Sequence, residues 1–210
     1  MPETSTAYPV SLSIDYPDRN LNRLTTFFRI FTAIPIVIII GLLSSAEFGW
    51  EGGGGGVYRY AAAGLVVLPL VLMLLFRQKY PKWWFDWNLS LTKFSTRVFS
   101  YLMLLTDQYP STDKDQAVHI EIRYPDASKE LKRGMPLIKW FLVIPHIFIL
   151  VFLYIGIIFV TIIAWFSILF TGKYPESLFE YVVGVMRWSL RVSVYAFLLT
   201  TDKYPLFSLK

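Results

Sequence analysis

The chain contains no cysteine, and only two of its 210 residues are histidines. The lack of cysteine excludes disulfides, thiolate metal sites and cysteine nucleophiles. Charged residues are also scarce, at 17% of the chain against about 25% in typical soluble domains. In contrast, 55% of the residues are apolar and the mean hydropathy is +0.49. A core of this size cannot bury all of that apolar surface, so we expect lipid to solvate part of it.

Three long segments carry no formal charge: Ile30–Leu43, Ala61–Phe76 and Phe141–Thr171. About 20 apolar residues are enough to cross a bilayer as a helix, so these segments predict an integral membrane protein. The residues before the first segment are polar, whereas a secretory signal opens with a short basic segment and then an apolar one. We therefore expect the first apolar segment to be kept as part of the folded protein.

Several short motifs occur twice, in the same order, in the two halves of the chain. The clearest is T-D-x-Y-P, at Thr106–Pro110 and again at Thr201–Pro205. The other pairs are V-S-L-S-I-D (10–15) and V-H-I-E-I-R (118–123), Y-P-D (16–18 and 124–126), R-I-F-T-A-I-P (29–35) and K-W-F-L-V-I-P (139–145), and K-Y-P (79–81 and 173–175). Recurrence in a fixed order indicates an internal repeat. We predict two tandem repeats, residues 1–110 and 111–210.

Each repeat is expected to contain a transmembrane helical hairpin. In repeat one the spans are predicted near Thr26–Leu43 and Tyr58–Phe76, joined by a flexible extramembrane loop with five consecutive glycines. Repeat two has no comparable insertion. By similarity, its apolar block is expected to turn near Tyr154-Ile155-Gly156, with arms at 137–153 and 157–172. One long tilted helix is the alternative.

A third helical segment follows each apolar block, at Lys82–Leu105 and at Glu176–Leu199. Its charged residues recur at offsets of seven and four and so share one stripe of the helix, among many Trp and Tyr residues. The charged residues are Asp86, Lys93 and Arg97 in repeat one, and Glu180, Arg187 and Arg191 in repeat two. Such a helix fits the bilayer interface.

The basic residues that flank the hairpins favour one membrane topology. If the third segments lie in the interface, all these basic flanks stay on the cytoplasmic side. We therefore predict four spans, two amphipathic interfacial helices and both termini in the cytoplasm. Six spans, with the charged stripes buried between helices, is the alternative.

Short β-strands are predicted before each hairpin, at Val10–Asp15 and Val118–Arg123, because apolar and polar residues alternate there. We expect the two strands to pair across a pseudo-twofold axis. Tyr-Pro recurs along the chain and is interpreted as a corner at the water–lipid boundary, since proline stops a helix and tyrosine anchors at the interface. The adjacent Asp107 and Asp202 are assigned no catalytic role. The fold class predicted is thus an all-α integral membrane protein with two short strands.

Two motifs of repeat two resemble those of a known family. The stretches I-K-W-F-L-V-I-P-H (138–146) and K-Y-P-E-S-L-F-E-Y-V-V-G-V-M-R-W-S-L-R (173–191) are similar to a bacterial membrane-protein family labelled domain of unknown function 4389. The resemblance covers nearly the whole chain in two copies. Repeat one departs from it, with Ser90 in place of Gly184 and Phe94 in place of Trp188. The resemblance implies a location in the bacterial inner membrane and no active-site residue.

No recognisable motif supports catalysis, so we expect no enzyme, no cofactor and no metal site. The two histidines lie in different settings, His119 on a predicted strand and His146 within an apolar segment. A histidine placed like His146 is more often a packed polar residue than a metal ligand. It is nevertheless the one titratable group deep in a predicted span, and hence the candidate for proton sensitivity. The net charge of +5 comes without a basic run, so no nucleic-acid partner is expected.

The favoured function is that of a non-catalytic accessory or scaffold protein. It would bind membrane lipids together with a partner membrane complex or a second copy of the chain. Anionic headgroups are expected to meet four basic side chains of the interfacial helices. These are Lys93, Arg97, Arg187 and Arg191.

The alternative function is a small oligomeric transporter or channel. Such proteins carry polar or broken segments inside the membrane. The polar candidates along a path are few: Thr32, His146, Thr161 and Ser167.

Overall fold

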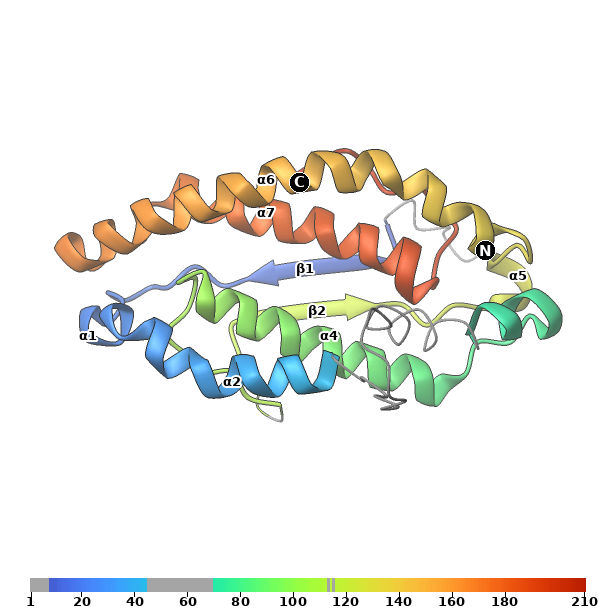
Figure 1. The fold of residues 1–210 in the computed structure, drawn as a ribbon, viewed down its shortest axis with the longest axis horizontal. Coiled ribbons are helices and arrows are strands. Elements are labelled where there is room, and N and C mark those ends of the chain that lie inside the picture. Colours follow the sequence, from blue (N-terminus) through green and yellow to red (C-terminus); the bar gives the residue numbers. More distant parts are fainter. Residues whose placement is uncertain (1–7, 45–69, 113, 115) are drawn as a thin grey trace, which may run out of the picture.

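The computed structural model describes residues 8–44, 70–112, 114 and 116–210 (Figure 1). The glycine-rich loop and most of the span predicted at Tyr58–Phe76 lie outside these residues. In chain order the described elements are β1 (Val10–Ile14), α1 (Arg23–Phe27), α2 (Arg29–Ser44), the π-helical turn η1 (Met73–Arg77), α4 (Lys82–Leu102), β2 (Val118–Ile122), α5 (Ala127–Glu130), α6 (Met135–Thr171), α7 (Glu176–Ser193) and the π-helical turn η2 (Val194–Leu198). The described chain is thus mostly helical, with one small sheet.

The two strands form an antiparallel ribbon, as the alternating sequence predicts. Leu12 lies opposite Ile120 at the centre of the ribbon. The apolar residues of both strands lie on one face, where all but the half-buried Val10 are buried, and the intervening residues, such as Glu121, are exposed on the other. A lone two-stranded ribbon is marginally stable in water, so the helices against its apolar face must support it.

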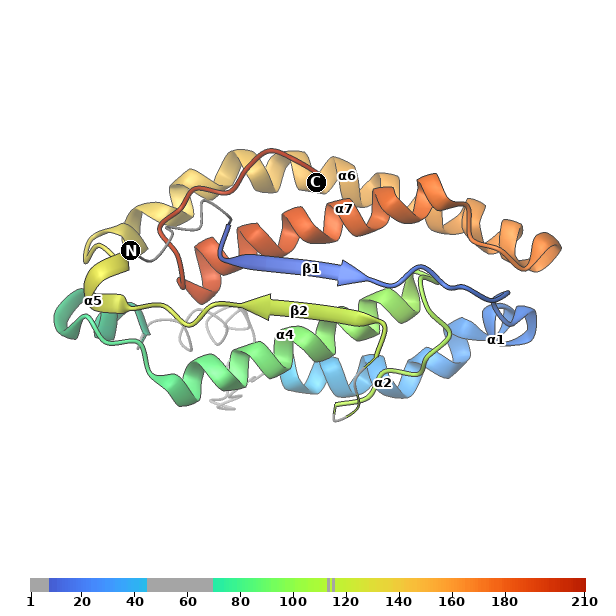
Figure 2. The same ribbon diagram turned by 180° about the vertical axis from the view of Figure 1, so that it is seen from behind.

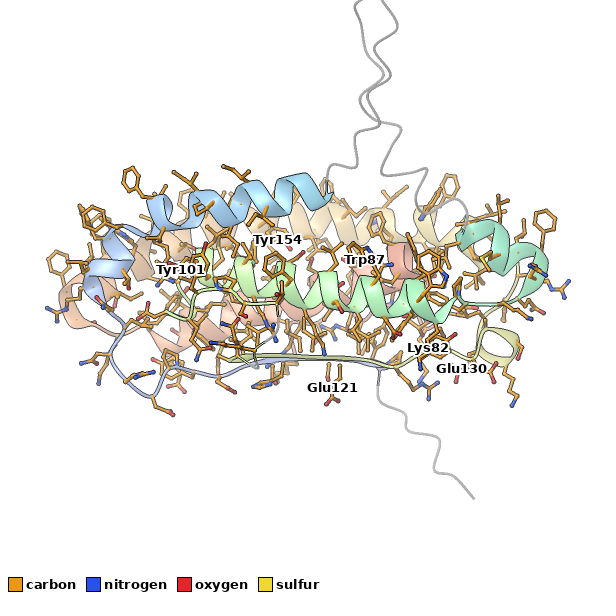
Figure 3. All side chains as sticks on the ribbon, turned by 90° about the horizontal axis from the view of Figure 1, so that it is seen from below. Lys82, Trp87, Tyr101, Glu121, Glu130 and Tyr154 are labelled. Atoms are coloured by element: carbon orange, nitrogen blue, oxygen red, sulfur yellow. The ribbon has the colours of Figure 1, made fainter. Side chains whose placement is uncertain are left out.

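The elements lie in layers along the long axis of the molecule. In Figure 2 the ribbon runs in front of α4 and α7, which flank it on either side. Figure 3 shows the ribbon edge-on at one surface and α2 at the opposite surface, with Glu121 projecting away from all the helices. Helix α6 runs alongside α7 over most of the length of the molecule (Figure 1). The polar ribbon and the most apolar helices therefore occupy opposite sides.

The K-Y-P motifs form the corners that begin α4 and α7. Gln78 and Gly172 adopt left-handed conformations, with φ of 46° and 78°, and end the preceding helices. Pro81 and Pro175 then occupy the N-cap positions of α4 and α7 in extended conformations. Proline has no backbone N–H to continue an earlier helix, which fits its place at a helix start. The predicted third segments are confirmed as helices.

Helix α6 is continuous from Met135 to Thr171, so the hairpin predicted to turn near Tyr154-Ile155-Gly156 is wrong. The alternative, one long helix, is what the chain forms. Gly156 suggested a turn, but its role is close packing. A Cβ atom at position 156 would meet Tyr181 Oη on α7, so a larger residue would require the Tyr181 side chain to shift. Pro145 lies inside α6 without ending it.

The membrane-span count also differs from the prediction. The span expected at Thr26–Leu43 is divided at Phe28, where the short helix α1 ends and α2 begins. Within the described residues, α6 is the one helix long and apolar enough to cross a membrane, while the comparable stretch of α2 is shorter. Four spans are therefore not seen in the described part of the chain.

Helix α6 buries only a narrow stripe against the rest of the protein. The stripe includes Val143, Leu150, Ile157 and Ala164, each at most 6% exposed and spaced at one-heptad intervals. Large apolar side chains cover most of its remaining surface, and Phe141 and Phe170 are 73% and 77% exposed. Helices α1 and α2 are similar, with Leu24, Ile30 and Phe31 among their exposed residues. Apolar exposure on this scale marks a surface that contacts something other than water.

Candidate functional site

A buried ion pair holds the start of α2 to the end of α4. Arg29, the first residue of α2, is only 3% exposed. Its guanidinium donates from Nη2 to Asp107 Oδ1 at 2.5 Å and from Nη1 to the Thr106 carbonyl at 2.7 Å. The same guanidinium lies over the ring of Tyr101, 4.1 Å from its centroid. One carboxylate, one carbonyl and one aromatic face thus surround the cation.

The same arrangement occurs in the C-terminal half, around Lys139. This lysine of α6 is fully buried, and its Nζ lies 2.7 Å from Asp202 Oδ1. Nζ also donates to the Thr201 carbonyl at 2.8 Å and lies 5.1 Å from the ring centroid of Tyr195. Arg29 and Lys139 occupy equivalent places in the R-I-F-T-A-I-P and K-W-F-L-V-I-P motifs. The two aspartates belong to the two T-D-x-Y-P motifs.

Each aspartate also binds the backbone ahead of its partner helix. Asp107 Oδ2 accepts from the Asn22 N–H at 2.6 Å, and Asp202 Oδ2 accepts from the Lys132 N–H at 2.7 Å. The T-D-x-Y-P motif therefore fixes a cation and a loop with a single carboxylate. A buried ion pair is tolerated only when such further hydrogen bonds satisfy its remaining polar atoms. The sequence analysis assigned these aspartates no catalytic role and did not predict the ion pairs, although the parallel recurrence of cation and aspartate was a usable signal.

Two tyrosines join the halves of the chain reciprocally. Tyr16 donates to the Tyr174 carbonyl and Tyr124 donates to the Tyr80 carbonyl, each at 2.5 Å. Thus the Y-P-D tyrosine of each half binds the K-Y-P tyrosine of the other. Burial raises the pKa of Tyr80 and of Tyr174. The phenol of Tyr80 consequently stays protonated and donates to the Leu198 carbonyl at 2.6 Å.

The second of these ion clusters lies in a segment that is similar to a known family. Residues 135–208 match the family model described as Domain of unknown function (DUF4389). The match covers the C-terminal part of the chain, from the start of α6 to beyond η2. No curated protein and no solved structure matches the chain. The DUF4389 segment holds α6, α7 and η2, and with them Lys139, Asp202 and His146. The family description names no activity.

Of the four basic residues predicted to meet lipid headgroups, two are buried. Arg97 donates from Nη1 to the Ser111 carbonyl at 2.7 Å, and Arg191 of the DUF4389 segment donates to the Ser208 carbonyl. Arg187 is half-buried and donates from Nε to the Leu12 carbonyl of β1 at 2.8 Å. Lys93 is also half-buried. The four side chains do not form one site, and headgroup binding by them stays a prediction.

His146 of the DUF4389 segment is fully buried and packed among aromatic rings. Its Nδ1 accepts a hydrogen bond from Trp188 Nε1 at 3.0 Å, and its ring stacks on Phe207 at 3.9 Å between centroids. In the N-terminal half the equivalent positions hold Ile36 and Phe94, which pack together in a small apolar cluster. Equivalent positions in the two halves thus hold a His–Trp pair in one half and an Ile–Phe pair in the other. This supports a packing role, while proton sensitivity stays a prediction.

The described residues contain no group of three or more His, Asp or Glu side chains able to hold a metal ion. His119 lies on the exposed face of the ribbon, where its Nε2 is 3.1 Å from Asp15 Oδ2, far from the buried clusters in the layered fold. The paired ion clusters are the dominant polar features. They hold the two most apolar helices, α2 and α6, against the rest of the molecule.

Proposed function

We propose that the protein is a non-catalytic membrane scaffold that lies flat in one leaflet, with α2 and α6 in the lipid and the ribbon in water. The observation that carries this proposal is the opposition of two surfaces. One is made of exposed apolar side chains on α1, α2 and α6, and the other is the polar face of the ribbon. An apolar surface rimmed by polar residues is typical of membrane contact.

The length of α6 supports a flat rather than an upright arrangement. A helix of 37 residues is about 55 Å long, whereas the hydrocarbon core is about 30 Å thick. Exposed apolar residues extend over the whole helix, from Leu137 to Phe170. An upright α6 would therefore leave much of this apolar surface in water. Because the ribbon runs along the same long axis of the molecule as α6, it would also enter the hydrocarbon, where unpaired strand edges are not tolerated.

We infer that the chain is a tandem duplication of one module, residues 1–110 and 111–210. The two ion clusters and the reciprocal tyrosine bonds support this inference, because equivalent positions make equivalent contacts. The ribbon register supports it as well. Leu12 pairs with Ile120, and these two residues hold the same place in the two alternating motifs.

We further propose that anionic headgroups bind the basic side chains that remain exposed around the apolar surface. Arg77 is the last residue of η1, Lys79 follows η1, and Lys173 follows α6, so each lies where an apolar segment ends. These positions suit phosphate contact better than the buried Arg97 and Arg191, because an exposed cation can reach a headgroup without breaking an existing bond. Basic residues near apolar helices favour the cytoplasmic leaflet of the inner membrane. We propose that the scaffold binds a partner membrane complex or a second copy of the chain.

Single-cysteine labelling tests the flat arrangement, because the chain has no cysteine of its own. Cysteines are placed at Leu137 and Phe170, near the two ends of α6, and at Ser13 on the exposed face of the ribbon. In sealed vesicles, a membrane-impermeant maleimide should label position 13 from one side and leave 137 and 170 protected from both sides. Labelling of 137 and 170 from opposite sides would show that α6 crosses the membrane.

The transporter alternative has no specific structural observation in its favour. Thr32 shares a hydrogen bond with Tyr101 Oη at 2.9 Å, and Thr161 donates to Met103 Sδ at 3.3 Å. Ser167 donates to the Lys173 carbonyl. These side chains and His146 thus bind four separate partners. Solute flux into liposomes that contain the protein, lost in His146→Phe, would support the transporter hypothesis.

A further inference from the structure

A pocket lies at the centre of the molecule, between the two amphipathic helices. Its volume is about 610 Å³, and its walls are formed by α4 and α7. Leu12, at the middle of the ribbon, forms its floor. Ser95 on α4 and Ser189 on α7 line opposite walls and stand at equivalent positions counted from the two K-Y-P motifs. The pocket therefore lies on the pseudo-twofold axis that relates the two halves.

The pocket lies on the helix side of the ribbon, away from the exposed polar face. Its floor is the buried apolar face of the ribbon, so the ribbon separates the pocket from the exposed polar face. Tyr154, from the middle of α6, bridges the two walls over the pocket. Its hydroxyl donates to Ser189 Oγ at 2.8 Å, and its ring packs edge-to-face on Phe99 at 6.1 Å between centroids. Figure 3 labels Tyr154 on the side of the ribbon where α2 lies. The pocket therefore lies on the side of the ribbon where the apolar helices lie.

The lining selects against charged ligands. No charged side chain is among the described residues that line the pocket. Two of its polar side chains use their donors within their own helix, since Thr96 Oγ1 donates to the Thr92 carbonyl at 2.7 Å and Asn88 Nδ2 to the Trp84 carbonyl at 2.8 Å. Methyl, methylene and ring groups provide most of the remaining surface. They come from Leu12, Leu91, Phe99, Met186, Leu190 and Phe197.

We propose that this pocket binds one hydrocarbon chain of a membrane lipid, drawn from the leaflet in which α6 lies. The proposal rests on the flat membrane arrangement given above. Its volume is within the range of about 300–1,000 Å³ usual for ligand pockets. A phosphate headgroup is excluded from the interior because no cation lines it. The headgroup would remain at the opening, near the exposed ring of Phe197.

The test uses the full chain in vesicles that contain phosphatidylcholine with a diazirine near the end of one acyl chain. After irradiation, cross-linked peptides are located by mass spectrometry. The flat arrangement predicts cross-links on the outer face of α6, for example at Phe148 and Phe159. The pocket predicts additional cross-links on residues 91–99 and 186–197. Cross-links on α6 without any in the pocket segments would overturn the pocket while leaving the membrane proposal intact. Absence of both would contradict both.

A variant whose pocket is filled by larger side chains is the second part of the experiment. Ser95→Phe combined with Ser189→Phe places two rings inside the pocket and should abolish the pocket cross-links while those on α6 persist. Ser90→Phe is the matched control, because Ser90 lies on the same helix but is exposed and does not line the pocket. Pocket cross-links that survive in the double variant would count against the proposal. If the double variant does not fold, as judged by circular dichroism, the cross-link map of the unmodified chain still decides.

Discussion

At the scale of single residues, Asp107 and Asp202 explain why the T-D-x-Y-P motif occurs twice. Each carboxylate binds a buried cation with one oxygen and a backbone N–H with the other. The cation enters a low-dielectric setting at the base of an apolar helix, which is costly unless the carboxylate accompanies it. The motif thus anchors the helices that we propose enter the lipid.

Removal of one carboxylate should therefore destabilise the fold strongly. Asp202→Asn leaves the Lys139 ammonium buried without a counter-charge, so we expect the free energy of unfolding to fall by about 3–5 kcal/mol. The measurement is denaturant or thermal unfolding in detergent, followed by circular dichroism. Asp202→Asn combined with Lys139→Met should recover part of the loss, because no buried charge remains. If the double variant is less stable than Asp202→Asn, the ion pair is not the cause.

Gly156 offers a second test at the same scale. Gly156→Ala would bring a methyl group against the phenol oxygen of Tyr181, so we expect a loss of about 1–3 kcal/mol from overpacking. Tyr181→Phe removes that oxygen and should restore part of the stability of the alanine variant, although it also removes the hydrogen bond from Tyr181 to the Leu153 carbonyl. Equal stability of the parent chain and Gly156→Ala would mean that α6 and α7 are not in close contact here.

The sequence analysis did not pair these residues, because the partners are far apart along the chain and only the parallel recurrence of cation and aspartate pointed to them. Arg29 and Asp107 are separated by 78 positions, and nothing between them sets their distance in space. Gly156 was equally ambiguous, since a glycine favours a turn and also permits the close approach of a ring. The position of the Tyr181 ring beside Gly156 shows that the glycine permits close packing and does not form a turn.

At the scale of elements, the continuity of α6 can be tested with proline. Ile155→Pro puts a proline in the middle of the helix, at a side chain that is already 47% exposed. In a continuous helix this removes a backbone hydrogen bond and creates a clash, so we expect a loss of about 3 kcal/mol or more. In a hairpin that turned at this point, proline would be accepted. Thermal unfolding of the variant distinguishes the two, with Ile155→Ala as the control for side-chain loss.

Elements with a periodic pattern were predicted well, and elements without one were not. The strands at Val10–Ile14 and Val118–Ile122 and the amphipathic helices α4 and α7 carry clear alternation or a charged stripe. Helix α6 is apolar on all sides, so its sequence shows neither which face is buried nor whether the chain turns back. The hairpin was inferred from similarity to repeat one instead, and that inference failed.

At the scale of the whole molecule, the ribbon joins the halves about a central point. The register places Ile14 opposite Val118 and Val10 opposite Ile122, symmetrically about the pair of Leu12 and Ile120. The strand pairing was predicted from the sequence, but the layers were not. Knowing that α2 and α6 share a side opposite the ribbon requires the packing of segments that are distant in the chain.

This symmetry predicts how the second half behaves by itself. Residues 111–210 alone would expose the edge and the apolar face of β2. A second copy can cover both, because β2 paired with β2 about Ile120 reproduces the present register. We expect this fragment to form a dimer in mild detergent, as measured by light scattering during size-exclusion chromatography. Ile120→Glu should prevent the dimer, and a monomeric fragment with native helix content would contradict the prediction.

A descent from such a dimer would account for the unequal interiors of the two halves. Once two identical subunits are fused into one polypeptide, a substitution in one no longer has to suit the other. On that descent, the site that holds Ile36 with Phe94 in one half and His146 with Trp188 in the other would result from that freedom. Specialisation of the ancestral subunit could then proceed on one side alone, while the shared frame of strands and anchored helices stayed the same.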